Sequence, residues 1–236
     1  MIQMPRVIVS VKDRIEAAEA LQVGATWLDV KDPSSGSLGM ASAKELSAIA
    51  KLNSDRDWKL SAALGELADL NEIPEDWPWE RIEFVKVGMS GLANGDWGLK
   101  MDRLGHALQN KFCSLVIGVY ADHVAANSPP WKACLEYAIG RQMPAILIDT
   151  FSKNGVRLMD LLDVEQIKLA IRMAREHSID IALAGSLDLP SVERLLDLGP
   201  SFFAARGAFC REGDRSGEFD ASRIRNWLSV VQNCAN

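Results

Sequence analysis

Short apolar runs rich in β-branched residues alternate along this chain with longer segments in which apolar positions recur at helical spacing. This alternation is typical of βα units built around a parallel sheet. The runs predict strands at residues 6–11, 26–31, 59–64, 84–88, 114–120, 145–149, 180–184 and 202–206. The helical spacing predicts helices at residues 15–21, 43–51, 99–109, 131–141, 160–177, 189–198 and 221–232. Residues 66–80 stay unassigned, because Pro74 and Pro78 interrupt their pattern.

Eight predicted strands share 236 residues, and no linker or low-complexity tract separates them. This size favours one α/β domain over residues 1–236, a compact (β/α)8 TIM barrel, over an open doubly wound sheet. A hydrophobic fraction of 48% is enough for the large core that this fold needs. Active sites of such barrels lie at the carboxyl ends of the strands, so polar residues there are the first candidates for function.

The charge and the ends of the chain limit the classes of partner. The formal net charge is -6, and the basic residues form no stripe, which argues against nucleic acid or an anionic membrane as a partner. No apolar stretch is long enough to span a bilayer and no signal-peptide pattern opens the chain, so a cytoplasmic protein is expected. A small phosphorylated substrate fits, because local lysines and arginines can outweigh the mean charge, and a homo-oligomer is left open.

Cysteine and histidine positions give no sign of a metal site or a disulfide framework. The cysteines are widely spaced and contain no CxxC pair: Cys113, Cys134, Cys210 and Cys234. The histidines are scattered: His106, His123 and His177. Only His123 follows a predicted strand end, where it can reach a substrate. We therefore expect neither a metal ion nor another cofactor.

Three lysines lie where predicted strands end: Lys31, Lys86 and Lys153. Burying an ammonium is costly unless it is paired, and burial lowers its pKa toward the range in which a neutral amine attacks a carbonyl. Asp29 shares a strand face with Lys31, and Asp149 ends the strand that precedes Lys153. A single lysine of this kind usually points to water. Three at corresponding strand ends, two of them beside carboxylates, indicate amine chemistry.

A phosphate site is expected after the last two strands. Gly185 and Ser186 follow the seventh strand, and Gly207 follows Arg206 at the end of the eighth. Small residues there let backbone N–H groups approach an anion, and Arg206 can add a bidentate contact. The alternative is that the glycines merely turn the chain. Two long loops lie on the same rim. Residues 31–39 are suited to cover a substrate or to contact it, and residues 210–217 either fold over a substrate or form an ordinary solvated loop.

The motifs at these strand ends are DVKDP at 29–33 with GSLG at 36–39, VKVG at 85–88, DT at 149–150 with KNG at 153–155, ALAGS at 182–186, RGA at 206–208 and GDR at 213–215. In order and spacing they span nearly the whole chain. Together they resemble the (5-formylfuran-3-yl)methyl phosphate synthase family, also called 4-(hydroxymethyl)-2-furancarboxaldehyde-phosphate synthase. Residues 65–81 and the N-terminal extension depart from the family pattern, and we expect them to affect oligomer contacts more than chemistry.

The resemblance implies a lyase with a class I aldolase-like TIM barrel. Such enzymes combine two molecules of glyceraldehyde 3-phosphate through a lysine Schiff base, with loss of phosphate and water, and supply methanofuran for one-carbon metabolism. By this resemblance Lys31 corresponds to the Schiff-base lysine. Lys86 and Lys153 correspond to further active-site lysines, and Asp29 and Asp149 to their carboxylates.

Two alternative functions remain open on the sequence alone. One is an ordinary class I aldolase that acts on triose phosphates and releases an acyclic product. The other is a phosphosugar-binding regulatory barrel without catalysis, since a fold by itself does not define a reaction.

Overall fold

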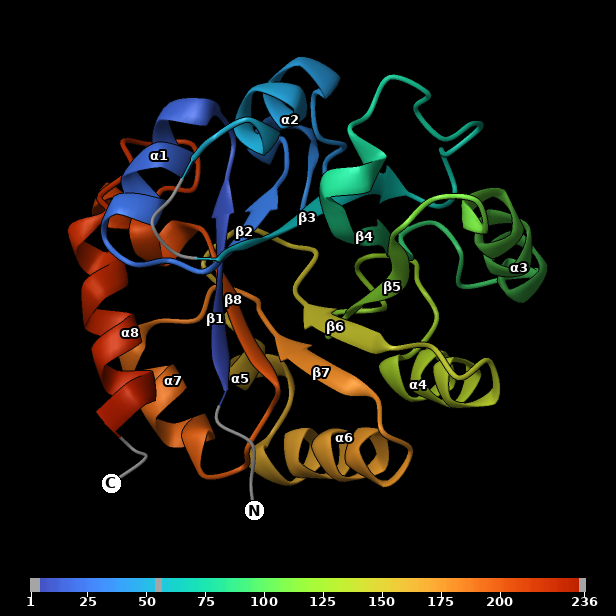
Figure 1. The fold of residues 1–236 in the computed structure, drawn as a ribbon. Helices are drawn as coiled ribbons and strands as arrows, with labels where there is room; N and C mark the ends of the chain where they lie inside the picture. The colour runs from blue at the N-terminus through green and yellow to red at the C-terminus, as the bar shows by residue number, and fades with distance from the viewer. Residues whose placement is uncertain (1–4, 54–56, 234–236) are drawn as a thin grey trace.

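The computed structural model describes residues 5–53 and 57–233. In these segments parallel strands pair in the order β1 to β8, and β8 pairs with β1 to close a barrel. Figure 1 shows the strands in the centre of the molecule with the helices around them. The predicted TIM barrel is therefore confirmed.

The strands match the predicted runs closely. β1, β5 and β6 have the predicted ends, and the other strands differ by two residues or fewer at each end. Their bounds are β1 (Arg6–Val11), β2 (Trp27–Val30), β3 (Lys59–Glu66), β4 (Ile82–Gly88), β5 (Ser114–Tyr120), β6 (Ala145–Asp149), β7 (Asp180–Leu183) and β8 (Phe202–Ala205).

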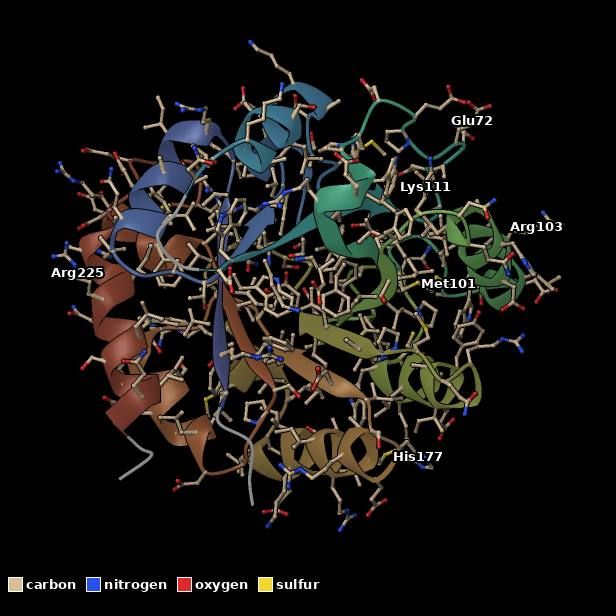
Figure 2. All side chains as sticks on the ribbon, in the orientation of Figure 1. Glu72, Met101, Arg103, Lys111, His177 and Arg225 are labelled. Atoms are coloured by element: carbon tan, nitrogen blue, oxygen red, sulfur yellow. The ribbon has the colours of Figure 1, made fainter. Side chains whose placement is uncertain are left out.

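The α-helices form the outer layer. They are α1 (Arg14–Gln22), α2 (Ala43–Ala50), α3 (Trp97–Leu108), α4 (Trp131–Gly140), α5 (Leu158–Leu161), α6 (Val164–Glu176), α7 (Leu189–Leu196) and α8 (Ser222–Asn233). In Figure 2, Arg103 and Arg225 lie at the periphery, whereas Met101 on α3 is buried. None of the helices in the described residues is long and apolar enough to cross a membrane.

The single helix predicted at residues 160–177 is wrong, because the structure divides this region into α5 and α6. Asp163 caps the second helix. Its carboxylate accepts a hydrogen bond from the backbone N–H of Gln166 at 2.8 Å, and the Gln166 side chain accepts one from the Asp163 N–H at 3.0 Å. This reciprocal capping box starts a new helix even though the apolar spacing continues across the break.

The connection between β3 and β4 lacks an α-helix. Residues 67–81 are all described, and they contain only a 3-10 turn at Trp79–Arg81. Trp77 and Trp79 are buried there with ring centroids 5.3 Å apart, and the Trp79 indole N–H donates to the Pro74 carbonyl at 2.9 Å. Two aromatic side chains thus cover the barrel wall where a helix would otherwise pack.

The barrel interior changes from apolar to polar toward the carboxyl ends of the strands. At the amino ends, the ring of Trp27 stacks on Phe84 with centroids 5.5 Å apart and meets Phe202 edge-on at 4.9 Å. Near the other end the buried side chains include those of Asp29 and Lys86. The fold therefore buries a charged pair near the carboxyl ends of the strands, beyond an aromatic layer at the amino ends.

Leu38, from the loop after β2, also enters the barrel. It is 1% exposed and belongs to the same inner cluster as Val116 and Tyr120 of β5. A Cβ at Gly118 would overlap the Leu38 side chain and would lie 3.2 Å from the Val87 carbonyl. Glycine at this position of β5 leaves the space that Leu38 fills. The loop after β2 is therefore packed into the barrel mouth.

We expect Gly118→Ala to lower the free energy of unfolding by about 1–3 kcal/mol, because a buried Leu38 has little room to move away from the added methyl group. Leu38→Ala should also destabilise, through the cavity that it leaves. The double variant should lose less stability than the sum of the two single losses, because the smaller side chain at position 38 removes the overlap. Urea unfolding of all four proteins measures this coupling, and strictly additive costs would show that the two residues do not compete for space.

Candidate active site

A cavity of about 400 Å³ opens at the carboxyl ends of β6, β7 and β8 and reaches across to the end of β2. Most of the predicted site residues line it: Lys31, Asp149, Lys153, Gly185, Ser186, Arg206 and Gly207. Asp29 and Lys86 are not among its lining residues and are buried in the barrel interior. The structure thus places seven of the predicted residues around one cavity and buries the other two as a pair.

Asp29 and Lys86 form the buried pair. The Lys86 ammonium contacts the Asp29 carboxylate, and their side chains are 7% and 3% exposed. Ser61 donates to Asp29 Oδ1 at 2.9 Å and Ser10 to Oδ2 at 3.2 Å. Both carboxylate oxygens therefore have donors, as a buried charge requires.

Lys153 also has a carboxylate partner. Its Nζ lies 3.0 Å from Asp149 Oδ1 and 2.6 Å from the Thr150 carbonyl oxygen. Burial favours the neutral form of Asp149, but Lys153 and Lys31 outweigh it and hold the pKa of that carboxyl below its ordinary value. No donor among the described residues bonds to Asp149 Oδ2, so an ionised oxygen is available at the cavity.

Lys31 differs from the other two lysines in having no carboxylate at ion-pair distance among the described residues. Its Nζ donates to the Ser37 carbonyl at 3.2 Å. Burial lowers its pKa from 10.5 to about 8; Lys153 and Arg215 add to this effect, and Asp149 and Asp29 oppose it. Roughly a tenth of such an amine is neutral at pH 7, which suits a nucleophile.

Unpaired backbone donors also line the cavity. Gly185 has φ +93°, and a Cβ there would lie 2.7 Å from Thr150 Cγ2, so the position requires glycine. Within the described part of the chain, no acceptor bonds to the N–H groups of Gly185, Ser186, Gly207 or Ala208. Four free donors from two loops at one cavity suit an anion.

Arg206 lines the cavity, but its guanidinium is engaged elsewhere. Nη1 lies 2.6 Å from Glu16 Oε2 and Nη2 lies 3.0 Å from Oε1, and both side chains are almost fully buried. Nη1 also donates to the Ser10 carbonyl at 3.3 Å, and Nε to the Arg215 carbonyl at 2.6 Å. The bidentate geometry expected for phosphate is thus used on Glu16, and a phosphate contact by Arg206 stays a prediction.

Sequence reasoning missed a further acid–base pair, Tyr120 and Glu66, at the same end of the barrel. Tyr120, at the end of β5, donates to Glu66 at the end of β3, which also accepts the Ser90 N–H at 2.9 Å. Burial raises the pKa of Glu66, and burial together with the Glu66 carboxylate raises that of Tyr120. Tyr120 is the register partner of Asp149 in the sheet. The position of Tyr120 at a predicted strand end was the one signal for this pair in the sequence.

Asp122 fixes the loop that carries Lys153. Its two carboxylate oxygens accept the N–H groups of Phe151 at 2.7 Å and Ser152 at 2.8 Å. The neighbouring His123 is partly exposed and is not among the residues that line the cavity. Asp122 therefore acts on the site through the backbone that follows β6.

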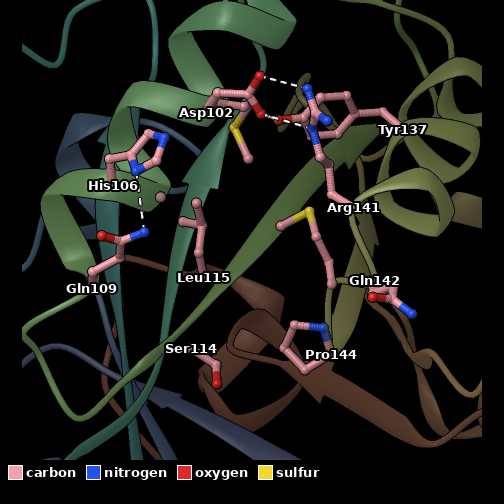
Figure 3. A pocket seen from close by; sticks show the side chains of 12 residues that line it. Asp102, His106, Gln109, Ser114, Leu115, Tyr137, Arg141, Gln142 and Pro144 are labelled. Atoms are coloured by element: carbon pink, nitrogen blue, oxygen red, sulfur yellow. Dashed lines mark hydrogen bonds and ion pairs between the residues drawn. The ribbon is translucent and has the colours of Figure 1, made fainter.

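A second hollow, of about 530 Å³, lies at the other end of the barrel wall beside Ser114 and Pro144, which mark the amino ends of β5 and β6 (Figure 3). Figure 3 shows Arg141 and Tyr137 turned toward Asp102. Their distances to its carboxylate are both 2.6 Å. These charged groups satisfy one another, and none of the predicted site residues lines this hollow.

Metal-ligating side chains do not gather in the described residues. No group of three or more His, Cys, Asp or Glu side chains there is placed to hold a metal ion. Cys113, Cys134 and Cys210 are free thiols, and Cys234 lies outside the described residues.

Comparison with known proteins gives a family match over most of the chain. The sequence profile of the family described as 4-HFC-P synthase matches residues 7–228. The (5-formylfuran-3-yl)methyl phosphate synthase of Methanopyrus kandleri is 30% identical over 219 residues, which cover 90% of this chain and 92% of that protein. The protein of the same name from Archaeoglobus fulgidus is 28% identical over 236 residues, covering 96% and 99%.

Solved structures resemble the chain in fold. Phosphoribosyl anthranilate isomerase from Thermus thermophilus has a TM-score of 0.64 at 14% identity, covering 97% of this chain and 99% of that one. The isomerase from Thermococcus kodakaraensis has a TM-score of 0.62 at 19% identity, with the same coverage. At these identities the likeness extends to the barrel fold alone.

The lowered pKa of Lys31 predicts its reactivity. The rate of acetylation of Lys31, followed by peptide mass analysis, should rise with pH with a midpoint near pH 8. The ε-amine of free Nα-acetyl-lysine should react faster only near its ordinary pKa of about 10.4. Because Asp149 raises the pKa of Lys31, Asp149→Asn should move the midpoint to lower pH. A midpoint in the range of free lysine would show that Lys31 is well hydrated.

The Arg206 contacts predict a loss of stability. Arg206→Ala leaves the buried Glu16 with Lys12, 3.4 Å away, as its remaining charged partner, and we expect the free energy of unfolding to fall by about 3 kcal/mol. The double variant Arg206→Met with Glu16→Leu should recover most of this loss, because it removes both charges. Urea unfolding tests both. Unchanged stability with a raised KM for substrate would instead support a direct phosphate contact.

Proposed function

Because the chain belongs to the 4-HFC-P synthase family, a family of enzymes, we propose that it forms (5-formylfuran-3-yl)methyl phosphate from two molecules of glyceraldehyde 3-phosphate. Inorganic phosphate and water are lost, and the product serves the biosynthesis of a methanofuran-type cofactor. The observation that carries this proposal is Lys31. It is an amine with a pKa of about 8 and no direct carboxylate partner among the described residues, at a cavity with free anion-binding donors.

In the first phase, neutral Lys31 attacks the carbonyl of one triose phosphate, and water leaves to give a protonated imine. The imine withdraws electrons, so Asp149 can remove a proton from the adjacent carbon through its free oxygen. The next carbon then releases its phosphate together with the bonding electron pair. The enol that remains on Lys31 loses its hydroxyl proton and adds through this carbon to the carbonyl of the second triose phosphate, whose oxygen takes up a proton. A carbon–carbon bond forms while the first molecule stays attached to Lys31.

In the second phase, the ring closes through an oxygen atom, and water is lost. These are proton transfers and eliminations that need no oxidant or reductant. The Asp149–Lys153 pair lines the cavity and can carry these protons, and the Asp29–Lys86 pair is buried in the barrel interior. The free N–H groups of the loops after β7 and β8 support the binding of the phosphate that is retained.

Lys31→Arg should abolish furan formation and borohydride trapping together, because a guanidinium stays protonated and forms no imine. Lys153→Ala should still trap glyceraldehyde 3-phosphate on Lys31 while furan formation slows by about two to four orders of magnitude. Intact mass after borohydride reduction reports the adduct, and near-ultraviolet absorbance reports the conjugated furan aldehyde.

The same two measurements on the wild-type protein distinguish the competing functions. An adduct without the ultraviolet signal of a furan would indicate an ordinary class I aldolase. Binding of triose phosphate with neither adduct nor furan would indicate a non-catalytic phosphosugar-binding barrel. Near-normal activity of Lys31→Arg would exclude Lys31 as the nucleophile.

A further inference from the structure

Three arginines line the cavity, and they differ in how their charge is neutralised. Nη1 of Arg157 lies 2.5 Å from the Asp188 carboxylate. Arg206 forms the bidentate pair with Glu16. Arg215 has no carboxylate at ion-pair distance among the described residues. Arg215 is therefore the cavity arginine whose charge is left for a ligand.

The backbone and one end of the Arg215 side chain are held in place. Its carbonyl oxygen accepts a hydrogen bond from Arg206 Nε at 2.6 Å, and its Nη2 donates to the Gly36 carbonyl at 2.6 Å. Within the described residues, no acceptor bonds to its Nε or Nη1. The guanidinium is thus anchored across the mouth by one nitrogen while two others remain unused at the cavity.

Partial burial makes an unused guanidinium costly. Burial is the main influence on Arg215 and lowers its pKa, although an arginine stays protonated. A charged group with incomplete hydrogen bonding in such a place is stabilised by an anionic ligand. The charge on Arg215 acts on both Lys31 and Asp149, so the guanidinium lies near the reacting groups.

The cavity therefore holds two separate kinds of anion-binding group. The first is the set of free N–H groups at Gly185, Ser186, Gly207 and Ala208. The second is the guanidinium of Arg215, which reaches toward the loop after β2. Two triose phosphates bring two phosphate groups to the cavity, and the proposed reaction retains one of them and releases the other.

We propose that Arg215 binds the phosphate group that is eliminated, an assignment that rests on the function proposed above. In this step a proton passes from the carbon beside the imine to a carboxylate, and a carbon–carbon double bond forms. The bond from the next carbon to the phosphate oxygen breaks, and its electron pair leaves with the phosphate. Hydrogen bonds from Arg215 Nε and Nη1 stabilise the charge that develops on the departing group.

Arg215→Gln tests the assignment, because it removes the charge and leaves a side-chain amide near Gly36. Arg211→Gln is the matched control: Arg211 lies in the same loop, is exposed, pairs with Glu218 at 2.9 Å and does not line the cavity. Each protein is incubated with glyceraldehyde 3-phosphate. Adduct mass after borohydride reduction, released inorganic phosphate and furan absorbance are then measured.

We expect Arg215→Gln to slow phosphate release and furan formation together by about a hundredfold, in the range seen when one transition-state donor is removed. The adduct should still form on Lys31, and a triose adduct that has not yet lost its phosphate should accumulate. Arg211→Gln should match the wild type in all three measurements. Arg215→Lys should fall between the two, because it keeps the charge but loses the planar fork.

Phosphate release at the wild-type rate in folded Arg215→Gln would overturn the assignment and leave Arg215 as a structural clasp. Loss of this phosphorylated adduct would also overturn it, because Arg215 would then act before elimination. If Arg215→Gln does not fold, as judged by circular dichroism, the comparison of Arg215→Lys with Arg211→Gln decides in the same way. Absence of adduct and furan in the wild type would instead overturn the proposed function itself, and this assignment with it.

Discussion

The site depends on how three lysines at one end of the barrel are paired. Each ammonium loses hydration there, and this cost must be met by a nearby negative charge or by loss of the proton. Asp29 meets it for Lys86, and Asp149 meets it for Lys153. Lys31 contacts only the Ser37 carbonyl within the described residues, and its pKa falls to about 8. The fold thus distinguishes Lys31, the proposed nucleophile, from the other two lysines, because it has no carboxylate at ion-pair distance among the described residues.

The loop after β2 links this chemistry to the packing of the barrel. Ser37 provides the carbonyl that holds the Lys31 amine, and its own hydroxyl donates to the Thr150 carbonyl at 2.6 Å. Leu38, the next residue, fills the space left by Gly118 inside the barrel. The same few residues therefore position Lys31, join the loops after β2 and β6, and fill the barrel interior beside Gly118. Formation of the proposed imine on Lys31 would displace the hydrogen bond to Ser37.

Much of the fold could be predicted, because strands and most helices follow local patterns in the sequence. The three lysines and their carboxylates were also within reach, since parallel strands place their ends on one rim. The residues that complete the site by pairing over long sequence distances could not be predicted. Arg206 and Glu16 are 190 residues apart, and nothing near either residue indicates the other. The division at Asp163 failed for the opposite reason, because a local capping signal outweighed a continuous apolar period.

The rim shows why the mean charge of a chain says little about its site. The chain carries a net charge of -6, yet Arg206 joins the last strand to Glu16 on α1, holds the backbone of Arg215, and so places a second guanidinium over the cavity. Glu16 neutralises the charge of Arg206, whereas Arg215 has no carboxylate at ion-pair distance among the described residues. A buried pair that is structural by itself can therefore set the electrostatics of the site, because it fixes where an unpaired cation lies.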